Sequence, residues 1–106
     1  MTFCFDIDGV LAETAGSDYK NSKPIQVNIN LVNLLFKHGH TIVLYTARGG
    51  NSGIDWREWT VDQMMMFGVK YHKLVMGKPA ADFYIDDKMV TPLQAVTILQ
   101  TMYHGF

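Results

Sequence analysis

The sequence predicts an α/β fold, in which a parallel sheet has helices on both faces and the domain has three layers. The main observation is that short apolar runs alternate with longer amphipathic segments along the chain. The second is that acidic residues follow the first and the last of these runs, where ligands gather in open α/β sheets. With 106 residues, 48% of them hydrophobic, the chain has the length and apolar content of one domain, residues 1–106.

Four short apolar runs predict the strands of this sheet. They lie at residues 2–6, 41–45, 73–76 and 83–85. Runs of this length, with apolar residues on both faces, are typical of buried parallel strands. Gly9 follows the first run closely and allows a sharp turn there.

The segment 24–38 is compatible with either a strand or a helix. Ile25, Val27 and Ile29 alternate with polar residues as in a strand, although the apolar residues further along also fit one face of a helix. Pro24 suits the first position of a helix and Gly39 the position after its end. Since fifteen residues would make a long strand, a helix is the preferred interpretation.

Two further segments predict helices, at 55–67 and 92–103. Asp55 and Glu58 have the spacing of an acidic capping box, while Thr91 and Pro92 are suited to the start of the last helix. Polar loops are expected at 10–23 and 49–53. A turn is expected at 77–79, followed by a brief helical turn at Pro79.

The composition limits the classes of partner. The formal net charge is −1 and no basic block is present, so neither nucleic acid nor a membrane surface is an expected partner. The single cysteine, Cys4, cannot form a disulfide within the chain. Without a signal-peptide pattern or a long apolar stretch, a cytoplasmic location is expected. A short and fairly apolar chain also makes a homo-oligomer plausible.

Polar residues follow the ends of the predicted strands. Asp6 and Asp8 follow the first, Thr46 the second and Lys78 the third, and Asp86 with Asp87 follows the last. Because the carboxyl ends of parallel strands share one edge of a sheet, these side chains are expected to converge.

A cluster of this composition suits phosphoryl chemistry. Four carboxylates close together would repel each other, and a hard divalent cation such as Mg²⁺, which prefers oxygen ligands, would relieve that repulsion. An ammonium and a hydroxyl nearby can bind a phosphoryl group. One aspartate could then attack phosphorus, while a second transfers protons to and from the reacting oxygens.

The motif Phe5-Asp6-Ile7-Asp8-Gly9-Val10, followed in order by Thr46, Lys78 and Asp86-Asp87, resembles the four motifs of the haloacid dehalogenase (HAD) superfamily. The resemblance covers the whole chain and implies a Rossmann-like fold with Mg²⁺-dependent phosphatase activity. It implies that Asp6 is the nucleophile and Asp8 the general acid/base, with Thr46 and Lys78 as the other two catalytic residues.

The same resemblance implies the binding residues. The metal is expected at Asp6, Asp8, Asp86 and Asp87, with Asp86 preferred over Asp87 as the direct ligand. Substrate contacts are expected from Thr46, Ala47, Arg48 and Lys78, although Arg48 is also compatible with an ordinary loop role.

No segment is long enough for the cap domain that larger members of the superfamily carry, so a capless phosphatase is expected. Tyr-Thr-Ala-Arg at 45–48 and Tyr-Ile-Asp-Asp-Lys at 84–88 also resemble short capsule-biosynthesis-type phosphatases. That resemblance implies a phosphorylated small molecule, preferably a sugar phosphate, as substrate. The alternatives are a phospho-accepting module resembling response-regulator receivers, and a catalytically silent scaffold.

Overall fold

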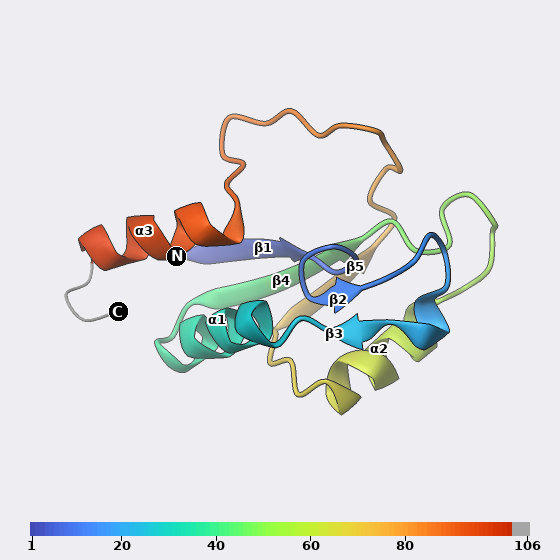
Figure 1. Ribbon diagram of the computed structural model, residues 1–106, viewed down its shortest axis with the longest axis horizontal. Helices are drawn as coiled ribbons and strands as arrows, with labels where there is room; N and C mark the ends of the chain where they lie inside the picture. The colour runs from blue at the N-terminus through green and yellow to red at the C-terminus, as the bar shows by residue number, and fades with distance from the viewer. Residues whose placement is uncertain (103–106) are drawn as a thin grey trace.

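A computed structural model describes residues 1–102 of the chain, and Figure 1 shows how its elements are arranged. The described part is an α/β fold with a three-stranded parallel sheet and helices. The elements in chain order are β1 (Thr2–Asp6), β2 (Ala12–Glu13), η1 (Tyr19–Asn21), β3 (Lys23–Pro24), α1 (Gln26–Lys37), β4 (Thr41–Thr46), α2 (Arg57–Met66), β5 (Lys73–Met76) and α3 (Pro92–Met102).

The sheet has the strand order β1-β4-β5, and both neighbouring pairs are parallel. Phe5 of β1 is level with Leu44 of β4, which is in turn level with Leu74 of β5. The strands predicted at 2–6, 41–45 and 73–76 are confirmed, with β4 one residue longer than expected. The order leaves β1 at an edge of the sheet, and all three strands end at the same edge of the fold.

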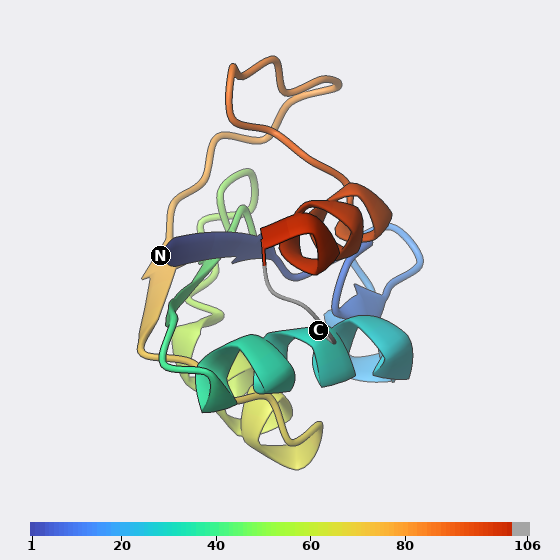
Figure 2. The same ribbon diagram turned by 90° about the vertical axis from the view of Figure 1, so that its left-hand side faces the viewer.

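The hydrophobic core lies on one face of the sheet. Phe5, Ile42 and Leu44 are buried in one cluster, whereas Cys4, whose side chain points to the opposite face of β1, is exposed. The same cluster takes Leu35 from α1, Met64 from α2 and Leu99 from α3, so all three helices contribute to one layer. Figure 2 shows the three helices on the same side of the sheet. The second helical layer expected on the opposite face is not among residues 1–102.

Helix α1 begins at Gln26, two residues later than expected. Pro24 instead lies in β3, which pairs antiparallel with β2, and the Ile25 N–H donates to the Leu11 carbonyl. This small hairpin gives order to a segment that the sequence predicts to be an irregular loop. After the helix, Gly39 has a φ of 85°, a conformation that favours glycine.

The two later helices differ in how they start. Helix α2 begins at Arg57 with Trp56 as its N-cap and has no side-chain cap, so the expected capping box of Asp55 and Glu58 is wrong; the Arg57 N–H donates to Asp55 Oδ1 just before the helix. At the start of α3, the Gln94 N–H donates to Thr91 Oγ1, and Gln94 Oε1 accepts from the Thr91 N–H, which completes a capping box. The predicted end of this helix at residue 103 lies outside the described residues. No helix within residues 1–102 is long and apolar enough to span a bilayer.

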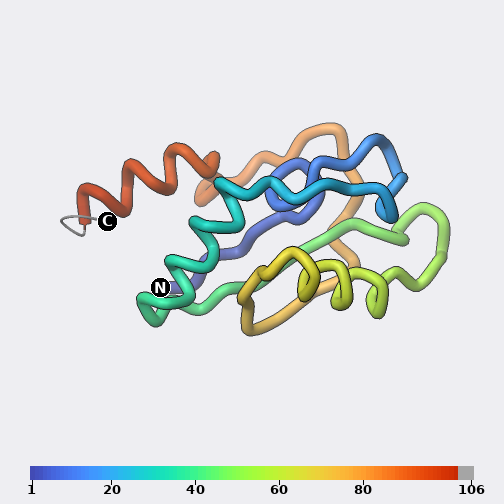
Figure 3. Tube along the Cα trace, turned by 60° about the horizontal axis from the view of Figure 1, so that its bottom comes forward, coloured from blue at the N-terminus to red at the C-terminus, as the bar shows by residue number. Residues whose placement is uncertain are grey.

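The fourth strand predicted at 83–85 is wrong. Residues 77–91 form one long connection that leaves the end of β5 and returns to α3 across the sheet, as Figures 1 and 3 show. Phe83 and Ile85 are 85% and 98% exposed, and the expected helical turn at Pro79 is absent. A run of three apolar residues supplies few ladder hydrogen bonds. Here Tyr84 has local contacts instead, because its hydroxyl donates to the Pro79 carbonyl and its ring faces Lys78.

Candidate active site

Asp6 and Asp8 lie at the edge of the sheet where the parallel strands end. Asp6 is the last residue of β1, and its Oδ1 accepts from the Ile7 N–H at 2.9 Å. The chain then turns at Gly9, whose φ is 90°, and the Ile7 carbonyl accepts from the backbone N–H groups of residues 10 to 12. A tight turn built on buried Ile7 therefore fixes the two carboxylates relative to β1.

Lys78 meets Asp6 at this edge. Its Nζ is 3.4 Å from Asp6 Oδ2, and its backbone N–H donates to the Thr46 carbonyl, which fixes the start of the connection next to β4. Partial burial raises the pKa of the Asp6 carboxyl above its ordinary value, and the Lys78 ammonium opposes that rise. The Lys78 ammonium also lies 4.0 Å from the centre of the Tyr84 ring.

Asp8 is held by Arg48 through two hydrogen bonds. Arg48 Nε donates to Asp8 Oδ2 at 2.9 Å and Arg48 Nη2 to Asp8 Oδ1 at 2.8 Å, which is the bidentate geometry that a guanidinium and a carboxylate favour. Thr14 Oγ1 donates to the same Asp8 Oδ1 at 2.6 Å and lies 2.6 Å from the Ser22 hydroxyl. In this arrangement Asp8 acts as a hydrogen-bond acceptor for three donors.

The Arg48 side chain is fully buried, so it is not placed to contact substrate as the sequence suggested. Its Nη1 donates to Gln63 Oε1 at 2.7 Å and to Thr60 Oγ1 at 3.3 Å, both on α2. The Arg48 Cζ also lies 4.8 Å from the centre of the Tyr19 ring, and Gln63 Nε2 donates to the Tyr19 carbonyl. Arg48 thus ties the end of β4, the helix α2 and the 10–23 segment to Asp8.

Sequence reasoning missed Thr14, Thr60 and Gln63. The one available signal was the spacing of Thr60, Gln63 and Met64, which places two polar residues on the face of α2 that also carries a core methionine. A buried face that mixes polar and apolar side chains indicates an internal partner for the polar groups.

Thr46 and Ala47 follow directly along β4. Thr46 is 1% exposed, and its Oγ1 accepts from the Arg48 N–H at 3.1 Å, so, like Arg48, it presents almost no surface to a substrate. Ala47 is half-buried and lines a pocket of about 260 Å³ whose walls include no acidic residue. Thr46, Lys78 and the first two aspartates therefore lie along one edge, as the sequence predicted.

Asp86 and Asp87 do not join this group. Both lie in the exposed 77–91 connection, where Asp86 Oδ1 accepts from the Lys88 N–H at 2.8 Å. That bond, with a further one involving Asp87, lowers the pKa of Asp86. Within residues 1–102 no three His, Cys, Asp or Glu side chains are grouped closely enough to hold a metal ion.

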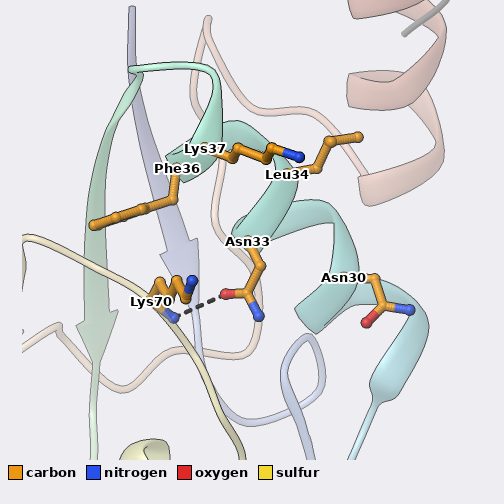
Figure 4. A pocket seen from close by; sticks show the side chains of 6 residues that line it. All are labelled: Asn30, Asn33, Leu34, Phe36, Lys37 and Lys70. Atoms are coloured by element: carbon orange, nitrogen blue, oxygen red, sulfur yellow. Dashed lines mark hydrogen bonds between the residues drawn. The ribbon is translucent and has the colours of Figure 1, made fainter.

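A larger hollow lies elsewhere, beside α1. It measures about 590 Å³ and is lined by residues of α1 together with Lys70 (Figure 4). Asn33 accepts from the Lys70 N–H and donates to the Gly68 carbonyl, so its polar atoms hold the chain before β5 in place. The hollow contains no acidic residue and lies near the start of β5, so the chemistry is assigned to the opposite edge.

Comparison with known proteins gives one informative match. A crystal structure of a structural-genomics target from Vibrio cholerae superposes with a TM-score of 0.77 and 29% sequence identity, covering 88% of this chain and 85% of that one. Its title names no function. No family model matches the chain, and no curated protein matches it. The match supports the α/β fold and leaves the function to be argued from the site.

Proposed function

We propose that the chain is a phosphomonoester hydrolase of the HAD type that acts through an aspartyl-phosphate on Asp6. The observation that carries the proposal is the arrangement at the strand ends. Asp6 is ion-paired with Lys78, and Asp8, two residues along, is held by Arg48 at the same edge. A nucleophile, a cation for phosphate and a second carboxylate with a fixed orientation are the groups that such a reaction needs.

In the proposed reaction an Asp6 carboxylate oxygen attacks phosphorus, and the bond from phosphorus to the ester oxygen breaks. The leaving oxygen takes a proton from Asp8. Asp8 then accepts a proton from a water molecule, which attacks the phosphorus of phospho-Asp6, and inorganic phosphate is released. The described geometry suits the second half best, because Asp8 is already an acceptor for Arg48 and Thr14.

Lys78 and Thr46 have supporting roles in this scheme. The Lys78 ammonium neutralises charge on Asp6 and on the phosphoryl oxygens in turn, which lowers the cost of bringing two anions together. In this scheme the Thr46 hydroxyl donates to a phosphoryl oxygen, which requires the strand end to open, because the residue is 1% exposed in this arrangement. Both groups are fixed by backbone bonds, since the Lys78 N–H is bound to the Thr46 carbonyl.

The proposal includes a requirement for Mg²⁺, for which the described arrangement is incomplete. Mg²⁺ is usually held by one or two carboxylates together with substrate oxygens and water. Here the Asp8 oxygens are taken by Arg48 and Thr14, so Asp6 is the available carboxylate at the edge. The other expected ligands, Asp86 and Asp87, belong to a separate segment, so no step is assigned to the metal.

The finer expectations from the sequence remain part of the same proposal. They are the fold of the superfamily without a cap domain, and a phosphorylated small molecule, preferably a sugar phosphate, as substrate. A cytoplasmic location, Mg²⁺ as cofactor, a possible homo-oligomer and the absence of nucleic-acid or membrane partners complete it. The net charge of −1 agrees with the last point.

The test is release of inorganic phosphate from p-nitrophenyl phosphate and from a panel of sugar phosphates, with and without Mg²⁺. We expect steady turnover by the wild-type chain and none by Asp6→Asn. A burst of one equivalent without turnover would instead favour a receiver-like module. No reaction with any phosphate ester would favour a silent scaffold.

A further inference from the structure

The pocket of about 260 Å³ that Ala47 lines has a consistent chemical character. All nine residues that line it are uncharged. Two aromatic residues, Tyr19 and Trp56, contribute to its wall, and Ser17, Asn51 and Ser52 add hydroxyl and amide groups. Its volume is slightly smaller than the roughly 300–1,000 Å³ that is typical of small-molecule pockets.

The aromatic wall is held in place by its neighbours. The Tyr19 and Trp56 rings meet edge to face, with centres 5.0 Å apart and an angle of 79°. Gly49 has a φ of 82°, and a Cβ at that position would collide with the Ile54 carbonyl oxygen and lie 3.3 Å from Trp56 Cδ1. The 49–54 loop can therefore pack against Trp56 only because residue 49 is glycine.

The pocket walls include neighbours of the proposed catalytic residues, although none of the catalytic residues themselves lines it. The Tyr19 ring packs on the guanidinium of Arg48, the group that holds Asp8. Ala47 follows Thr46 in sequence, and Ala80 lies two residues after Lys78, so the lining includes both chain segments that lead away from the phosphate-binding groups. The proposal therefore requires a ligand that reaches from these walls to a phosphoryl group at Asp6.

We propose that this pocket binds the alcohol part of the phosphate ester and selects an uncharged, hydroxyl-rich group about the size of a monosaccharide. The inference rests on the proposed phosphatase function and adds the place and the chemistry of substrate selection. Aromatic rings cover the apolar faces of such a group, while hydroxyl and amide side chains bond its hydroxyls. A carboxylate or ammonium on the alcohol part would lose its hydration without gaining a charged partner.

Binding can be measured independently of turnover, because the chain has two tryptophans. Asp6→Asn combined with Trp59→Phe leaves Trp56 as the sole reporter in a chain expected to be inactive. We expect glucose 1-phosphate to change its emission in a saturable way, at concentrations at least tenfold lower than inorganic phosphate or 3-phosphoglycerate requires. The matched control, Asp6→Asn with Trp56→Phe, keeps only Trp59 and should show little change. An equal response of both reporters, or equal binding of all three probes, would overturn the proposal.

A second experiment separates this inference from the proposed function. Asn51→Asp places a charge in the pocket, and Asn30→Asp makes the same change at an exposed residue of α1 outside it. We expect Asn51→Asp to lower kcat/KM for glucose 1-phosphate at least tenfold, mainly through KM, and to change acetyl phosphate hydrolysis by less than threefold. Asn30→Asp should change neither rate.

Each outcome of this experiment has one meaning. If wild type hydrolyses neither acetyl phosphate nor a sugar phosphate, the proposed function is wrong. If it hydrolyses acetyl phosphate but Asn51→Asp affects both substrates equally, or neither, the pocket is not the site of selection.

Discussion

Replacing Arg48 by alanine should destabilise the chain and also release Asp8. The side chain is fully buried and donates four hydrogen bonds, two to Asp8 and two to α2. Removing it leaves buried acceptors on Thr60 and Gln63 without their donor, and Asp8 without its ion-pair partner. The 10–23 segment also loses the contact between the guanidinium and the Tyr19 ring.

The size of the loss follows from how much of this network water can reach. Removing one partner of a buried ion pair costs about 3–5 kcal/mol. The Asp8 side chain is 26% exposed, so water can replace part of what it loses, and we take the lower end, about 3 kcal/mol. For a domain of this size that corresponds to a fall of roughly 10–20 °C in Tm.

Arg48→Lys gives a sharper comparison, because lysine keeps the charge but cannot form the two parallel bonds. We expect about half of the loss seen with alanine, together with a larger fall in kcat than in KM, since Asp8 remains but is poorly oriented. Urea unfolding followed by circular dichroism gives the stability, and a double-mutant cycle with Asp8→Asn gives the coupling energy. A loss below about 1 kcal/mol for Arg48→Ala, or a coupling near zero, would refute the reasoning.

Further predictions concern Asp6, Asp8, Gly49 and Asp86. Because the pKa of Asp6 is raised in the folded chain, its ionisation opposes folding. The contribution of Asp6 to stability is therefore greatest below the ordinary aspartate pKa and is lost as pH rises through the raised pKa of Asp6. Phosphate release needs the ionised form of Asp6, so the rate of release should decline at acidic pH. Asp6→Asn should abolish turnover and raise the free energy of unfolding at neutral pH by a fraction of 1 kcal/mol, as thermal denaturation can check; a clear loss of stability would contradict this. Asp8→Asn should slow alkyl phosphates more than aryl phosphates, whose leaving groups need less protonation, and equal losses in steady-state rates would argue against the acid role. Gly49→Ala should lower stability by about 1–3 kcal/mol, measured in urea, because of backbone strain and a collision with the Ile54 carbonyl oxygen, whereas Gly53→Ala, at a similar φ in open space, carries only the strain and should cost less. Asp86→Asn should leave the Mg²⁺ concentration needed for half-maximal activity unchanged, because this residue lies in a segment apart from the other acids, and a raised requirement in a Mg²⁺ titration would return it to the proposed metal site.

Much of the sheet could be predicted because its strands carry their own signal. The predicted runs at 2–6, 41–45 and 73–76 each contain several consecutive apolar residues and lie next to a strand of the same kind. The run at 83–85 has only three such residues. Its side chains stay exposed, because the contacts of Tyr84 with Lys78 and Pro79 are local and require no partner strand. The pattern of apolar residues does not reveal whether such local contacts are more favourable than the hydrogen bonds of a strand pair.

The candidate site could be predicted only as far as the backbone determines it. Asp6, Thr46 and Lys78 meet because parallel strands end at a common edge, and this follows from the order of the elements. The role of Arg48 could not be predicted in the same way. The direction of its side chain depends on acceptors at Thr60 and Gln63, which lie on a helix whose rotation is set by packing.

The position of β1 at the side of the sheet has a practical consequence. In the described chain, β4 pairs with one side of this strand only, so its other side presents backbone groups on the same five residues that end in Asp6. Unpaired strands of this kind readily accept a second chain. Any such association would form beside the proposed nucleophile, so specific activity should be measured over a range of protein concentrations. Lysine substitutions on this strand, intended to keep the protein monomeric, would also alter the surroundings of Asp6.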